Sequence, residues 1–112
     1  MLKQLITIVL TILTVLIISS NPPALAADTN NGAEIFSIHC AGCHPNGNNI
    51  IRRGKNLKKR ALRRNKLDSA DAIASLVANG KNNMSAYQDR LSEKQIENVA
   101  AYVLQQAEKG WR

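Results

Sequence analysis

The sequence has few of the residues on which catalytic and metal sites usually depend. Its 112 residues include two cysteines, two histidines and two methionines, and only 4% of the chain is aromatic. It has no internal repeat, no convincing β-strand pattern and no grouping of nucleophile, general base and general acid. These absences argue against an enzyme, and they predict a single all-α domain with about four helices.

The scarcity of cysteine also limits the metal and redox chemistry. Cys40 and Cys43 are so close that a disulfide between them would stabilise little. A thioredoxin-like dithiol would need βαβ patterning, which is missing. A zinc site needs four ligands, and only His39 and His44 could join the cysteines, from positions directly beside them. A tetrahedral zinc cage is therefore not expected.

The two cysteines instead belong to a five-residue motif with a specific meaning. The motif has the form C-x-x-C-H, which is typical of covalent attachment of a c-type haem, and it reads Cys40-Ala41-Gly42-Cys43-His44. Two thiols at this spacing can each bond one vinyl group of a haem, and the following histidine can then bind the iron. We expect one covalent haem, which would also give this small, aromatic-poor domain a large apolar body to fold around.

Met84 is the candidate for the second axial ligand of the haem iron. It is the only methionine besides Met1, and it follows His44 by forty residues in a polar loop between two predicted helices. Polar surroundings make it a poor core residue, whereas His/Met ligation is common in c-type cytochromes. His39 lies too near Cys40 to reach the opposite face of a haem. With Met84 bound, the iron is closed and outer-sphere electron transfer follows.

The first 26 residues have the pattern of a cleaved export signal. Lys3 precedes a fourteen-residue run at 5–18 that is apolar apart from three threonines, and an Ala-x-Ala site ends at Ala26. Fourteen residues are few for a membrane span, which needs about 20. We expect a signal peptide at 1–26 and a mature domain at 27–112 that is exported across a membrane.

Periodic apolar residues and turn signals place the helices of the mature domain. One helix is expected from Gly32 to about Cys40, one within 52–66, one at 70–79 after a cap at Asp68 or Ser69, and one from Ser92 to Gly110. Gly32 shares a face with Phe36, so it either admits another helix closely or belongs to a frayed end.

A strongly basic segment, residues 52–66, contains nine Lys or Arg in fifteen residues, more positive charge than the formal net charge of +7 of the whole chain. It could be a solvated helix face, a contact for an anionic membrane surface, or a surface that attracts an acidic redox partner. Nucleic acid is not expected as a partner of an exported protein. An acidic partner fits a haem carrier best, because opposite charge speeds encounter.

Several stretches beyond the haem motif give the chain a specific resemblance. They span the mature domain and comprise Gly32-Ala33-Glu34-Ile35-Phe36, Asn79-Gly80-Lys81 ahead of Met84, Asp89-Arg90-Leu91-Ser92, Val99-Ala100-Ala101-Tyr102-Val103 and Trp111. With these stretches, 27–112 resembles the cytochrome c6 family, small class I cytochromes c of cyanobacteria and algal chloroplasts.

The resemblance implies a fold, ligands and partners. It implies thioether bonds at Cys40 and Cys43, axial ligands His44 and Met84, and a class I fold wrapped around one haem. It also implies a soluble carrier between cytochrome b6f and photosystem I or a terminal oxidase, with Arg90 on the docking surface. Gly32 and Phe36 would pack on the last helix near Tyr102, and Asn49 and Lys55 would lie near the haem.

The chain departs from the family at two positions near the ligands. Ser85 stands where a proline usually follows the ligand methionine, and Leu76 aligns with a glutamine that faces the haem in the main photosynthetic members. Replacing a dipole near the iron by an alkyl group changes the electronic environment. We expect a lower reduction potential, as in divergent c6-like groups.

A different hypothesis is a haem-based sensor or ligand-binding module in which a small gas displaces Met84.

Overall fold

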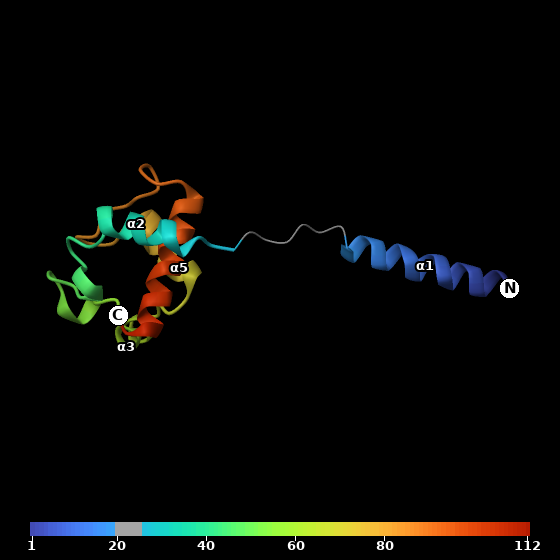
Figure 1. The fold of residues 1–112 in the computed structure, drawn as a ribbon, viewed down its shortest axis with the longest axis horizontal. Helices are drawn as coiled ribbons and strands as arrows, with labels where there is room; N and C mark the ends of the chain where they lie inside the picture. Colours follow the sequence, from blue (N-terminus) through green and yellow to red (C-terminus); the bar gives the residue numbers. More distant parts are fainter. Residues whose placement is uncertain (20–25) are drawn as a thin grey trace.

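The computed structural model describes residues 1–19 and 26–112, and in these ranges the chain forms helices and loops with no β-strand (Figure 1). The predicted all-α class is therefore confirmed. Residues 26–112 contain four α-helices: α2 (Thr29–His39), α3 (Lys59–Arg64), α4 (Ala70–Asn79) and α5 (Glu93–Lys109). Two short 3-10 turns, η1 (Pro45–Gly47) and η2 (Arg53–Lys55), lie between α2 and α3.

Helix α1 (Leu2–Ser19) covers most of the predicted export signal and stands apart from the rest of the fold in Figure 1. Within the described residues it contacts none of the other helices. No helix among those residues has the length and apolar character needed to cross a membrane. The predicted cleavage site includes Ala24 and Leu25, which lie outside the described residues.

The helix boundaries follow the local capping chemistry. Asp28 accepts hydrogen bonds from the backbone N–H groups of Asn30 and Asn31, so α2 begins three residues before the predicted Gly32. Helix α4 has the predicted bounds, with Ser69 as its N-cap. Helix α5 begins with a capping box between Ser92 and Gln95 and ends at Gly110, whose φ is 69°.

The domain is organised around the crossing of α2 and α5, the first and last helices of the mature region. Gly32 is buried at this crossing, and a Cβ atom on it would lie 2.2 Å from the backbone oxygen of Asn98 and 2.8 Å from Cβ of Tyr102. The side chain of Asn98 also accepts a hydrogen bond from the Asp28 N–H at 2.9 Å. Gly32 therefore permits close helix approach, as one of the two predictions held.

The apolar core lies between α5 and the helices that pack on it. Helices α2 and α4 pack most extensively on α5, and α3 contributes two buried residues. The rings of Phe36 and Tyr102 pack in a tilted arrangement across the α2–α5 crossing with centroids 5.4 Å apart, as the resemblance implied. The main buried cluster consists of Ile35, Phe36, Leu62, Ile73, Val77, Leu91, Ile96, Val99, Ala100, Val103 and Ala107.

Candidate haem site

The C-x-x-C-H motif forms a tight turn directly after α2. The backbone N–H groups of Cys40 and Ala41 both donate to the carbonyl of Phe36, and the His44 N–H donates to the carbonyl of Cys40 at 2.9 Å. This turn places both thiols and the imidazole on a short segment that continues from a helix held in the core. The geometry of the motif is thus fixed at one end by the α2–α5 crossing.

No disulfide joins the two cysteines, and they differ in their environments. Cys43 is exposed, whereas Cys40 is half-buried against the core. Burial, with a smaller contribution from neighbouring Cys43, raises the pKa of the Cys40 thiol to about 11. Neither sulfur is committed to a disulfide, so both are available for thioether bonds.

The imidazole of His44 is oriented by a hydrogen bond to the backbone. Its Nδ1 lies 2.9 Å from the carbonyl oxygen of Asn48, and since a carbonyl can only accept, Nδ1 carries the proton. The other ring nitrogen, Nε2, is then the one with a free lone pair. Burial lowers the pKa of His44, partly opposed by the bond to Asn48, and this favours the neutral imidazole that binds metals.

The loop that supplies this carbonyl is braced by its own backbone. At its base, the N–H of Leu57 donates to the carbonyl of Gly47 at 2.7 Å, and further along the N–H of Ile50 donates to the carbonyl of Cys43 at 3.1 Å. The side-chain oxygen of Asn49 accepts hydrogen bonds from the backbone N–H groups of Ile51 and Arg52. Its side-chain NH₂ group donates to the carbonyl of Lys55. The loop therefore keeps one shape beside the motif.

Met84 lies at the end of a two-residue turn that follows α4. Lys81 and Met84 exchange two backbone hydrogen bonds, both 3.0 Å long, around Asn82, whose φ is 52°. Gly80 packs so closely on this turn that a Cβ atom there would lie 2.6 Å from the Met84 carbonyl oxygen. The Met84 side chain is half-buried against the core rather than free in solvent.

A tyrosine joins the Met84 segment to the haem motif. The Tyr87 hydroxyl donates to the carbonyl of His39 at 3.0 Å, and the His39 ring meets the Tyr87 ring edge-on with centroids 5.7 Å apart. The guanidinium of Arg90 lies over the Tyr87 ring, 4.2 Å from its centroid. The two segments predicted to carry axial ligands thus lie side by side.

The side chains of these segments fit a c-type haem. They comprise two free thiols, an imidazole with Nε2 unengaged and a half-buried thioether. Within residues 1–19 and 26–112, no group of three or more His, Cys, Asp or Glu could hold a metal ion. Two thiols, one imidazole and one thioether are the side chains with which proteins hold a c-type haem.

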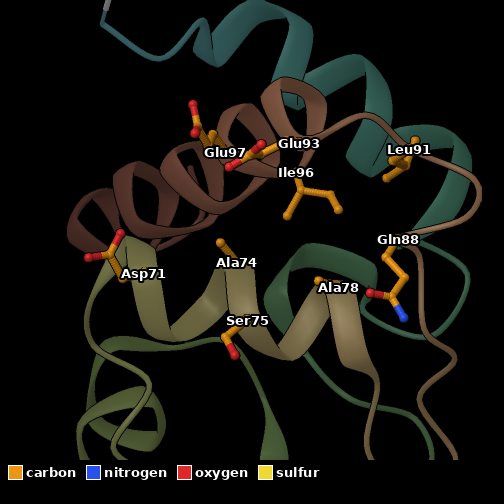
Figure 2. Close-up of a pocket in the computed structure, with 9 residues that line it drawn as sticks. All are labelled: Asp71, Ala74, Ser75, Ala78, Gln88, Leu91, Glu93, Ile96 and Glu97. Atoms are coloured by element: carbon orange, nitrogen blue, oxygen red, sulfur yellow. The ribbon is translucent and has the colours of Figure 1, made fainter. Parts of the chain in front are cut away.

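A groove lies elsewhere, between α4 and α5, and none of the four predicted site residues lines it (Figure 2). It has a volume of about 390 Å³, and acidic residues line its rim. Two of them, Asp71 and Glu93, lie in the first turns of their helices, where the helix dipole favours carboxylates. Its lining consists of Asp71, Ala74, Ser75, Ala78, Gln88, Leu91, Glu93, Ile96 and Glu97. The helix dipoles therefore account for two of the three carboxylates on this rim, Asp71 and Glu93.

Comparison with known proteins identifies the family. A family model described as "Cytochrome C oxidase, cbb3-type, subunit III" matches residues 27–103. A protein named cytochrome c6-like from Nostoc sp. (strain PCC 7120) is 60% identical over 110 residues, which is 98% of this chain and 99% of the relative. The chain belongs to the cytochrome c6 family. It is accordingly a c-type cytochrome with one covalently bound haem c, and members of this family are electron carriers.

Two further members of the cytochrome c6 family support the same conclusion. Cytochrome c6 of Synechococcus sp. (strain PCC 6312) is 51% identical over 97% of each chain. The crystal structure of cytochrome c6C from Synechococcus sp. PCC 7002 is 61% identical, with a TM-score of 0.69, and covers 70% of this chain and 96% of its own. The predicted class I cytochrome fold and the c6-like resemblance are confirmed.

Three features of the site were not predicted from the sequence. The acceptor for His44, Asn48, acts through its backbone carbonyl, so its side chain carried no signal. The bond between Tyr87 and His39 joins residues 48 positions apart and depends on the tertiary fold. The third is the contact of Trp111 with the haem-motif loop, to which an Asn46-Gly47 turn signal and a lone tryptophan were the only clues.

Proposed function

We propose that this cytochrome is an exported electron carrier with haem bonded to Cys40 and Cys43 and with His44 and Met84 as axial ligands. The observation that carries the proposal is the 2.9 Å contact between His44 Nδ1 and the Asn48 carbonyl. It fixes the tautomer with Nε2 available to iron, on the same turn as two free thiols.

The bound haem would supply a one-electron couple, and the chain would hold its iron closed on both sides. Met84 lies on a turn whose backbone is braced by Lys81 and Gly80, and this would keep its thioether close to the iron. A closed iron exchanges electrons through the haem edge without binding a substrate. This arrangement favours a carrier over a sensor in which Met84 is displaced by a gas.

Export would follow cleavage after Ala26. Helix α1 makes no contact with the other helices among the described residues, so its removal would cost the domain no packing. We infer a thylakoid lumen or a periplasm as the destination, where the mature domain would act as a soluble protein. The family relatives in cyanobacteria are consistent with either compartment.

The redox partners would carry acidic docking surfaces. The basic segment, residues 52–66, folds back on itself, since Arg64 donates to the Gly54 carbonyl and Lys55 donates to Asn65. All nine of its Lys and Arg side chains are exposed. Such a concentration of charge would steer the carrier to an acidic partner. Cytochrome b6f as donor, with photosystem I or a terminal oxidase as acceptor, fits the family.

A reduction potential lower than that of the main family members is part of the proposal. It rests on Leu76, a half-buried residue of α4, in place of the glutamine expected from the family pattern, and on Ser85 after Met84. The high identity to proteins named cytochrome c6-like and cytochrome c6C supports a place in a divergent branch.

A visible spectrum of the oxidised holoprotein tests the ligation. A far-red charge-transfer band is expected from a methionine sulfur on ferric iron, and Met84→Ala should abolish it and lower the potential. Rapid binding of carbon monoxide to the reduced parent protein would contradict the closed site and favour the sensor hypothesis. An unchanged band in Met84→Ala would show that another residue is the ligand.

A further inference from the structure

The two residues that follow α5, Gly110 and Trp111, have an unusual backbone path. After α5, Gly110 has a φ of 69° and Trp111 a φ of 61°, so the chain turns back towards the domain. A positive φ is uncommon for a bulky residue with a side chain, and it persists only where the surroundings hold it. The Trp111 N–H is held by the carbonyl of Gln106 at 2.8 Å.

This turn lays the Trp111 indole across the base of the loop that follows the haem motif. The ring lies directly over Gly47, where a Cβ atom would be 2.4 Å from both Cε2 and Nε1 of the indole. Its Nε1–H donates to the carbonyl of Leu57 at 3.0 Å. The same ring packs on Phe36, with centroids 5.2 Å apart, so it joins the loop to the α2–α5 crossing.

The loop closed in this way is the one that orients His44. Gly47 and Leu57, the two loop residues that the indole contacts, are joined by a backbone hydrogen bond. Asn48, whose carbonyl accepts the Nδ1–H of His44, follows Gly47 directly. Gly47, which lies under the indole, is therefore joined by a single peptide bond to Asn48, whose carbonyl orients the His44 imidazole.

We propose that Trp111 is a positioning residue for His44, acting through Gly47 and the Asn48 carbonyl. The inference rests on the proposed role of His44 as axial ligand. Loosening the base of the loop would lengthen the hydrogen bond from Nδ1 and free the ring plane. A weaker bond makes the imidazole a poorer donor, which favours the reduced state of a bound metal and raises the reduction potential.

Trp111→Phe in the holoprotein is the test, because it keeps the aromatic packing and removes the N–H donor. The haem methyl resonances of the oxidised protein report the direction of the axial imidazole plane. We expect these resonances to shift and the potential to rise relative to the parent. Ile96→Ala is the control, since Ile96 is buried between α4 and α5 beside the groove of Figure 2 and its loss destabilises the core without touching this loop.

The result that overturns the proposal is a Trp111→Phe variant that loses thermal stability as Ile96→Ala does, with methyl shifts and potential unchanged. If the parent itself lacks the spectral signature of His ligation, the proposed function fails instead, and the two failures are thereby distinguished.

Hydrogen exchange in the parent holoprotein gives a second measurement that does not depend on a variant folding. If Trp111 holds the loop, the indole Nε1–H and the His44 Nδ1–H should exchange through one opening, at rates that respond together to temperature. A His44 proton that stays protected while the indole proton exchanges more than about tenfold faster would overturn the proposal, since opening of the indole contact would then leave the imidazole in place.

Discussion

The Tyr87 hydroxyl donates a hydrogen bond to the backbone carbonyl of His39, at 3.0 Å and across 48 positions of sequence. His39 immediately precedes the haem motif, and Tyr87 follows Met84 by three residues. This single bond is thus a direct link between the segments that we propose to hold the two axial ligands.

Tyr87→Phe should weaken that link. We expect the free energy of unfolding of the holoprotein to fall by about 1 kcal/mol, the usual contribution of one hydrogen bond, and the far-red band to disappear at a lower temperature. Tyr102→Phe is the matched control, because no hydrogen bond from the Tyr102 hydroxyl occurs among the described residues. Equal loss of the band in both variants would contradict a specific role for Tyr87.

Gly32→Ala should force α2 and α5 apart. The added Cβ would lie 2.2 Å from the Asn98 carbonyl oxygen, so the helices must shift, with a loss of about 1–3 kcal/mol in the free energy of unfolding. Gly54→Ala is the control, since a Cβ there meets only the end of the Arg64 side chain, at 3.8 Å. Denaturant titration of both holoproteins would check the difference. A Gly32→Ala variant as stable as Gly54→Ala would show that the crossing tolerates the methyl group.

Leu76→Gln should raise the reduction potential. The substitution introduces an amide dipole at a half-buried position of α4, and each ~1.4 kcal/mol of preference for the reduced state corresponds to about 60 mV. Ser75→Gln places the same group at an exposed neighbouring position and should change the potential little. Redox titration of the parent and both variants decides the matter. A parent potential equal to that of the main cytochromes c6, or no rise in Leu76→Gln, would remove Leu76 as the cause.

Arg60→Glu should slow electron transfer to an acidic partner. Arg60 is an exposed residue of α3 in the basic segment, and one charge near a protein surface contributes about 1 kcal/mol in water, or a several-fold change in rate. Lys94→Glu changes the net charge equally at the start of α5 and should slow the reaction less. Stopped-flow rates should fall with added salt for the parent. Rates that are insensitive to salt would contradict electrostatic steering.

Local signals in the sequence were enough to predict the helices and the haem motif. Helix α4 was predicted with its observed bounds because Ser69 and Gly80 give strong signals at its ends. The close helix approach at Gly32 was one of two options, since the missing side chain has meaning only once its neighbour is known. Interactions that pass through backbone carbonyls, as at Asn48 and Leu57, leave no trace in residue type.

The crossing of α2 and α5 also has a consequence for how the protein is made. The first helix of the domain finds its partner only in residues 93–109, near the end of the chain, so a nascent or translocating chain cannot close its core until nearly all of it has emerged. During that interval Cys40 and Cys43 would not yet lie beside a closed core. The late arrival of α5 therefore leaves a period of synthesis in which both thiols are accessible.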